Sequence, residues 1–166
     1  DQGGKGIIQG SLDSGAFDTF ILSDGMIGDS LTDTFGKSLN KSFGSLPGST
    51  GKGAGVFTTV AKAAGIDSSG PYTGESYDAA ALIVLAMQAG GNADRATIAK
   101  NVMAVANGPG KKIYPGELKK ALDLLAKGKG IDYEGATGVS FTDVGEASGS
   151  FLEKEIKGGK FKTKKQ

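Results

Sequence analysis

Apolar side chains in the first third of the chain switch between helical spacing and short continuous runs. Two segments carry apolar residues at every third or fourth position, as in a helix with one buried face. Two others are short apolar or β-branched runs bounded by turn residues, as in strands. In chain order, the predicted elements are a helix over 5–14, a strand over 17–22, a helix over 29–39 and a strand over 42–46. This alternation predicts a parallel α/β layer.

The middle of the chain has a helical pattern and its end has a strand pattern. The predicted helices cover residues 56–64, 73–88, 92–106 and 117–127, and the predicted strands cover 138–141, 149–156 and 160–163. The helix over 73–88 is apolar on nearly all sides, which is typical of an element buried between layers.

The composition removes several classes of function. The 166 residues include no histidine and no cysteine, so the commonest general base, the commonest metal ligand and thiol chemistry are absent. We therefore expect a protein that is not an enzyme and uses no cofactor or metal. Lys plus Arg is 19 against 18 for Asp plus Glu, which gives no bulk field for nucleic acid or an anionic membrane. The lysines near the end are interpreted as a solvated terminus: Lys157, Lys160, Lys162, Lys164 and Lys165.

The glycine-rich segment 48–55 does not have the spacing of a nucleotide-binding loop. A P-loop would need glycine at Leu46 and a hydroxyl residue at Gly53, and a dinucleotide fingerprint would need glycine at Val56. Four acidic residues near the end lack the pattern of a calcium-binding loop. They are interpreted as exposed turn carboxylates: Asp132, Glu134, Asp143 and Glu146.

Three segments, in this order, carry a resemblance to a known family. They are Phe-Ile-Leu-Ser-Asp-Gly-Met at 20–26, Pro-Tyr-Thr-Gly-Glu-Ser-Tyr-Asp-Ala-Ala at 71–80, and Gly-Ile-Asp-Tyr-Glu-Gly-Ala-Thr-Gly-Val-Ser-Phe at 130–141. Together they resemble the C-terminal half of type I periplasmic binding proteins, the family of the leucine/isoleucine/valine-binding proteins and related amide and amino-acid receptors. The likeness extends over nearly the whole chain, and the third segment is the most specific.

The resemblance implies two α/β lobes joined by three crossing strands, with a ligand closed between them by a hinge motion. On this basis, residues 1–66 are predicted to belong to the second lobe, 67–136 to form a helical segment of the first lobe, and 137–166 to be terminal crossover strands. The N-terminal half of the protein is expected to be absent from this chain. The helices over 73–88 and 92–106 would then expose apolar faces that the missing half, or another chain, covers.

The first candidate ligand residues follow the strand predicted over 17–22. The resemblance implies that Asp24 receives the ammonium group of an amino-acid ligand. The pattern agrees, because ligands of open parallel sheets collect at the carboxyl ends of strands, and a carboxylate binds ammonium through charge-assisted hydrogen bonds. The alternative is that Asp24 only forms a turn. Ser23 and Met26 flank it, Met26 either as an adaptable apolar wall or as core packing.

A second group of candidates lies at the start of the helix over 73–88. The resemblance implies that Tyr72 lines the ligand cleft, where its ring could cover an aliphatic group and its hydroxyl could bind a polar one. The alternative is a loop aromatic that covers the helix start. Glu75 ranks below Tyr72, because a negative charge in the first turn already suits the helix dipole. Tyr77 is interpreted as packing.

The resulting hypothesis is a periplasmic, extracytoplasmic bacterial protein that binds an amino acid or a similar small amine or amide for an ABC-type importer. Its expected partners are this ligand and a membrane permease, with no nucleic acid. The alternative is a ligand-sensing domain of a receptor or regulator with the same fold. A catalytic role has no nucleophile and base pair to support it.

Overall fold

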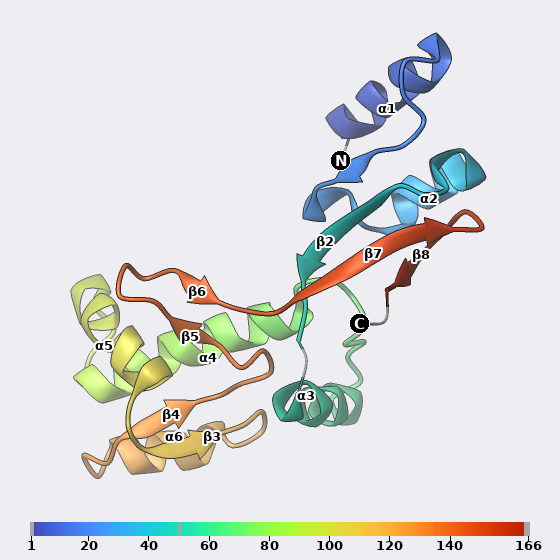
Figure 1. Ribbon diagram of the computed structural model, residues 1–166. Coiled ribbons are helices and arrows are strands. Elements are labelled where there is room, and N and C mark those ends of the chain that lie inside the picture. Colours follow the sequence, from blue (N-terminus) through green and yellow to red (C-terminus); the bar gives the residue numbers. More distant parts are fainter. Residues whose placement is uncertain (1, 50, 165–166) are drawn as a thin grey trace. The chain divides into compact units, whose positions relative to one another are not determined.

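The chain forms two compact units in a computed structural model that describes residues 2–49 and 51–164 (Figure 1). Unit 1 comprises Asp1–Pro47 and Phe151–Gln166, and unit 2 comprises Gly48–Ser150. Each unit has an apolar core of its own. The units divide after residues 47 and 150, whereas the sequence placed boundaries after 66 and 136. The assignment of segments to the lobes of a larger protein stays a prediction.

Unit 1 is a mixed sheet with helices. Its elements are α1 (Gln2–Ser14), β1 (Ile21–Leu22), the 3-10 helix η1 (Asp24–Met26), α2 (Asp29–Phe35), the 3-10 helix η2 (Gly36–Leu39), β2 (Phe43–Pro47), β7 (Phe151–Lys157) and β8 (Lys160–Thr163). The strand order is β1-β2-β7-β8. The pair β1 and β2 is parallel, which confirms the predicted parallel layer, and β7 is antiparallel to both of its neighbours.

The first strand is shorter than the predicted run 17–22. Only Ile21 and Leu22 pair with β2, and Phe17 is 70% exposed. Phe20 lies just before the paired residues of β1, and its N–H donates to the buried Ser42 Oγ at 3.1 Å. Apolar composition predicted a longer strand, but a strand also requires a neighbour, and the described residues provide one only from Ile21 onward.

Unit 2 contains four of the six α-helices of the described residues. Its elements are α3 (Lys52–Ala63), α4 (Thr73–Gly90), α5 (Arg95–Asn107), β3 (Lys111–Ile113), α6 (Leu118–Leu125), β4 (Ile131–Tyr133), β5 (Ser140–Phe141) and β6 (Ala147–Ser148). All four helices predicted for this region are present. Strands β3 and β4 form a parallel pair, and β5 and β6 an antiparallel one. The sequence did not predict β3, β4 or β6.

Helix α4 lies at the centre of the unit 2 core. Its Leu82 and Leu85 are buried with Val105 of α5 and with residues of β3, β4 and α6. Its Ile83 and Val84 are 43% and 40% exposed, so the expected apolar face is present on α4. The same expectation was wrong for α5, whose Ile98, Val102 and Val105 pack into this core. Within the described residues, no helix has both the length and the hydrophobicity to cross a membrane.

Helix α3 begins four residues before the predicted start at Val56. The earlier residues were interpreted as a loop because of their glycines. Gly53 is instead helical, and its backbone lies against the carbonyl oxygen of Gly135, where a Cβ atom would clash. This glycine serves close packing between α3 and the loop after β4, a role that a sequence pattern does not distinguish from flexibility.

Candidate ligand-binding site

The turn after β1 presents Ser23 and Asp24 to solvent. Both residues are exposed, and Asp24 begins the 3-10 helix η1 directly beyond the carboxyl end of the strand. The carboxylate of Asp24 accepts one hydrogen bond from its neighbour, the Gly25 N–H, at 2.7 Å. One local bond leaves much of the acceptor capacity of a carboxylate for another donor.

Met26 faces the opposite way, toward the body of unit 1. It is half-buried and packs against the core, and its thioether lies over the backbone of Gly4 in α1. A Cβ atom on Gly4 would lie 2.6 Å from the Met26 methyl carbon. Core packing, one of the two roles considered for Met26, is therefore present, and its role as a ligand wall stays a prediction.

Tyr72 has an unusual backbone conformation at the start of α4. It is the N-cap residue, with φ 63° and ψ 10° in the left-handed region, where residues with a side chain are uncommon and strained by about 1–2 kcal/mol. Its carbonyl accepts the Ser76 N–H at 2.9 Å, and the residue is 37% exposed. Such outliers are found preferentially at functional sites.

Glu75 and Tyr77, in the first turns of α4, have different surroundings. Glu75 is half-buried in the first turn. Tyr77 packs on Phe57, with ring centroids 5.3 Å apart, and its hydroxyl accepts the Gly116 N–H at 3.0 Å. These contacts confirm the packing role predicted for Tyr77. The five candidates thus form two groups: Ser23, Asp24 and Met26 in unit 1, and Tyr72 and Glu75 in unit 2.

A buried carboxylate that the sequence analysis did not single out lies one turn further along α4. Asp78 is 2% exposed, and it accepts four hydrogen bonds from the last residue of β4 and the segment that follows it. The Tyr133 hydroxyl and the Ala136 N–H donate to Oδ1 at 2.9 and 2.8 Å. The Thr137 N–H and hydroxyl donate to Oδ2 at 2.8 and 2.7 Å. We call this set of contacts the Asp78 clamp.

The clamp shapes its surroundings. Burial, together with the nearby Asp78 carboxylate, raises the pKa of the Tyr133 hydroxyl far above its ordinary value, so the phenol stays protonated and acts as the donor. Gly135 lies between the donors Tyr133 and Ala136 in the chain and has φ 57°. A Cβ atom there would clash with the Asp78 carboxylate. Glycine is therefore required at 135 both for its conformation and for space.

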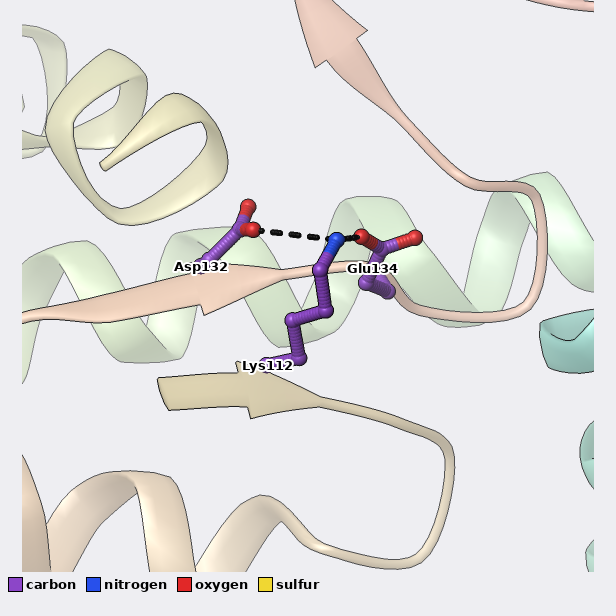
Figure 2. A network of polar contacts seen from close by, with 3 residues as sticks. All are labelled: Lys112, Asp132 and Glu134. Carbon is purple, nitrogen blue, oxygen red and sulfur yellow. Dashed lines mark hydrogen bonds and ion pairs between the residues drawn. The ribbon is translucent and has the colours of Figure 1, made fainter. Parts of the chain in front are cut away.

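A third polar group lies at the solvent side of β3 and β4. Figure 2 shows the Lys112 ammonium between Asp132, at 3.3 Å, and Glu134. The two carboxylates raise the pKa of Lys112, Glu134 most strongly. Lys112 is exposed, so the pair of contacts is a surface ion pair of small energetic weight. The prediction of exposed turn carboxylates is wrong for Asp132, which lies in strand β4, and both Asp132 and Glu134 are half-buried because they pair with Lys112 of β3.

No family model matches the chain. The solved structure of the leucine-binding protein LivK of Thermotoga maritima aligns with 96% of this chain at a TM-score of 0.63 and 17% sequence identity. The chain has the fold of a type I periplasmic binding protein. The aligned part is 40% of the LivK chain, so this chain corresponds to less than half of that structure.

A curated relative matches a shorter stretch. Over 68 residues, 41% of this chain, the sequence is 40% identical to the chemotactic signal transduction system substrate-binding protein BasB of Halobacterium salinarum. The match covers 16% of BasB. By name, both similar proteins are binding proteins rather than enzymes.

Within the type I periplasmic binding fold, the Asp78 clamp joins two of the segments that carried the resemblance. Asp78 belongs to the segment 71–80, and its donors belong to 130–141. A signal for its burial was present in the sequence: Leu82 and Leu85 follow at i+4 and i+7, so Asp78 lies on the apolar face of α4. An acidic residue on such a face must find partners of its own.

Proposed function

We propose that this chain is part of a solute-binding protein, and that the intact protein captures an amino acid or a similar small amine or amide. The fold shared with a leucine-binding protein and the 40% identity to part of a substrate-binding protein support the binding role. The observation that carries the proposal is the exposed Asp24 carboxylate, which lies in the turn at the carboxyl end of β1 with one local hydrogen bond. Ligands of open α/β sheets bind at such ends.

In this proposal, Asp24 receives the ammonium group of the ligand. The Ser23 hydroxyl beside it can accept or donate a further hydrogen bond, and the solvent-facing part of Met26 adds apolar contact. In unit 2, Tyr72 covers the apolar part of the ligand with its ring, held in place by its strained helix-cap conformation, and Glu75 contributes a second, weaker polar contact. As the resemblance implies, the ligand is held between the two lobes of the intact protein.

The cellular role that we propose is that of the extracytoplasmic, periplasmic component of an ABC-type importer. The protein would deliver its ligand to a membrane permease and carry out no catalysis. The rest of the intact protein, which LivK has in the 60% of its chain not aligned here, would cover the apolar face of α4 at Ile83 and Val84. Burial of those side chains against a second layer is favourable in proportion to their area.

A second candidate function is ligand sensing, because the curated relative BasB is named as part of a chemotactic signal transduction system. The ligand site would be the same, and only the membrane partner would differ. Crosslinking of the ligand-loaded intact protein in its own membranes separates the two: an importer component is recovered with a permease, and a sensor with a receptor.

The site is tested by replacing Asp24 with alanine in the intact protein. Loss of a buried ammonium contact costs on the order of 2–5 kcal/mol, which lowers affinity roughly thirtyfold or more. The matched control is Asp29→Ala, which removes an equally exposed carboxylate from the first turn of α2. Calorimetric titration with leucine and other amino acids gives the affinities. Equal affinities for the parent and Asp24→Ala would contradict the role of Asp24.

A further inference from the structure

Exposed lysines from two distant segments meet at one end of unit 1. Lys37 and Lys41 come from η2 and the residues after it, and Lys157 and Lys160 flank the turn between β7 and β8. All four are exposed. We call this group the basic corner. Figure 1 shows the turn of the terminal hairpin beside the segment that follows α2.

Backbone contacts hold the two segments together. The Gly159 N–H donates to the Asn40 side-chain oxygen at 3.1 Å, and the Lys41 N–H donates to the Ile156 carbonyl at 3.1 Å. Gly159 also lies close to the backbone of Gly36 and Lys37. The lysines near the end of the chain were interpreted as a solvated terminus. Instead, Lys157 and Lys160 belong to an ordered hairpin that adds its charges to those of Lys37 and Lys41.

The conformation of Lys41 also points to a surface role. Its φ is 77°, a left-handed conformation that glycine or asparagine adopts at lower cost. A lysine in this position strains the backbone and adds a charge to the corner. Residues with a side chain in such conformations cluster at functional sites.

The basic corner retains an excess of positive charge. Among the described residues, Lys157 is the one member in an ion pair, with Glu155 at 2.9 Å, and Lys162 stands opposite the same glutamate across the hairpin. The lysines of unit 2 differ, because several are neutralised by acidic partners. These pairs are Lys112 with Asp132 and Glu134, Lys119 with Asp123, and Lys120 with Glu117.

The type of cation indicates the type of partner. The chain has a single arginine, Arg95, and it lies in unit 2. Protein interfaces favour arginine, which binds carboxylates in a bidentate way, and contain less lysine. Lysines are hydrated point charges that suit a diffuse anionic surface, and each lysine that lies near an anionic bilayer strengthens the attraction about fivefold.

We propose that the basic corner binds the surface of an anionic phospholipid bilayer. It lies at the amino ends of β1 and β2, because Lys41 precedes β2 and the two strands are parallel, whereas Asp24 lies beyond the carboxyl end of β1. Association through this corner therefore leaves the turn at Asp24 open. The net charge of +1 did not reveal it, because acidic residues elsewhere balance the sum.

The test is cosedimentation of the 166-residue chain with vesicles of equimolar phosphatidylglycerol and phosphatidylcholine at low ionic strength. The variant combines four substitutions: Lys37→Gln, Lys41→Asn, Lys157→Gln and Lys160→Gln. Asparagine is chosen at 41 because it tolerates the left-handed conformation. We expect the partition coefficient to fall about fivefold for each lysine removed, and roughly a hundredfold or more for the combination. Raising the salt concentration should also release the parent chain.

The matched control removes the same number of charges from unit 2. It combines Lys119→Gln, Lys120→Gln, Lys127→Gln and Lys129→Gln, and its partition coefficient should stay within about twofold of the parent. Circular dichroism checks that all variants are folded. If the fourfold variant is not folded, Lys157→Gln with Lys160→Gln, in the exposed turn, should still lower binding about twenty-fivefold.

Three outcomes would overturn the proposal. One is absence of binding by the parent chain to the phosphatidylglycerol vesicles at low ionic strength. Another is equal binding to vesicles of phosphatidylcholine alone, which would assign the association to apolar surface. The third is equal loss of binding in the basic-corner variant and the unit 2 control.

Discussion

Asp24 in unit 1 and Asp78 in unit 2 differ in what their carboxylates contact. Asp78 is buried and accepts four hydrogen bonds from its own chain, whereas Asp24 is exposed and accepts one from the next residue. The first carboxylate is satisfied by the fold, and the second has capacity left for a ligand. Both lie in segments that resemble the same family, so resemblance alone does not separate a buried, fully bonded acid from an exposed one. Burial and hydrogen bonding do.

The largest effect on folding is expected at Asp78. Replacing it with alanine leaves the Tyr133 hydroxyl, the buried Ala136 N–H and the half-buried N–H and hydroxyl of Thr137 without this acceptor, which should lower the free energy of unfolding by about 3–5 kcal/mol. Asp78→Asn keeps one acceptor oxygen and should cost less. Urea denaturation followed by circular dichroism measures both. A loss below about 1 kcal/mol for Asp78→Ala would show that the clamp does not hold unit 2 together.

Tyr133 tests the same clamp from the donor side. Tyr133→Phe removes one hydrogen bond to the carboxylate and keeps the ring, so it should lower the free energy of unfolding by about 1.5–3 kcal/mol. Tyr77→Phe is the matched control, because its hydroxyl accepts one bond from a backbone N–H and should cost about 1 kcal/mol or less.

The raised pKa of Tyr133 adds a pH dependence. The phenol stays protonated in the folded state, whereas in the unfolded state it ionises near its ordinary pKa of about 10. Its contribution to stability is therefore complete below about pH 10 and falls by about 1.4 kcal/mol per pH unit above it. The denaturation series at alkaline pH should show this slope in the parent and a smaller one in Tyr133→Phe. The same slope in both proteins would contradict the protonated donor.

A smaller effect on folding, with a clear effect on association, is expected at the apolar face of α4. The isolated chain should bind a hydrophobic dye or self-associate, because Ile83 and Val84 are exposed together. Ile83→Glu with Val84→Lys should reduce both signals. The control pair Ile66→Lys and Val144→Glu changes two isolated exposed side chains. It should leave dye binding and self-association unchanged. A parent chain that is monomeric and does not bind the dye would refute this expectation.

The smallest effect on folding is expected for Asp24→Ala. An exposed carboxylate with one local bond should change the free energy of unfolding by less than about 0.5 kcal/mol. Read in the same denaturation assay as Asp78→Ala, this value would sharpen the contrast between the two aspartates. A loss above about 1.5 kcal/mol would mean that Asp24 stabilises the turn and would remove the basis for its ligand role.

The long helices were predictable because their periodicity is strong and local. The predicted helix over 73–88 differs from α4 by two residues at its end. Strands β3 and β4 were not predictable from pattern, because each has three residues and Lys111 and Lys112 fill two of the positions in β3. Their side chains Ile113, Ile131 and Tyr133 are buried against α4 and α5, and a local pattern does not give such tertiary contacts.

The position of Asp24 in an exposed turn after β1 was predictable, because the position after a strand is a local feature. Its role as a ligand residue stays a prediction. The left-handed conformation of Tyr72 and the partners of Asp78 were not accessible, since a pattern gives neither the dihedral angles of one residue nor contacts between positions that are more than 50 residues apart. The basic corner was missed for the same reason, because Lys37 and Lys41 reach Lys157 and Lys160 only through contacts between segments more than 100 residues apart.

The central claim is that the intact protein binds a small amine-bearing solute, and calorimetric titration with a panel of amino acids, leucine first, tests it most directly. We expect at least one compound to give a saturable heat with one molecule bound per protein, and Asp24→Ala to weaken that binding roughly thirtyfold or more. Binding of no compound in the panel by a folded, intact protein would contradict the amino-acid hypothesis and leave only the fold.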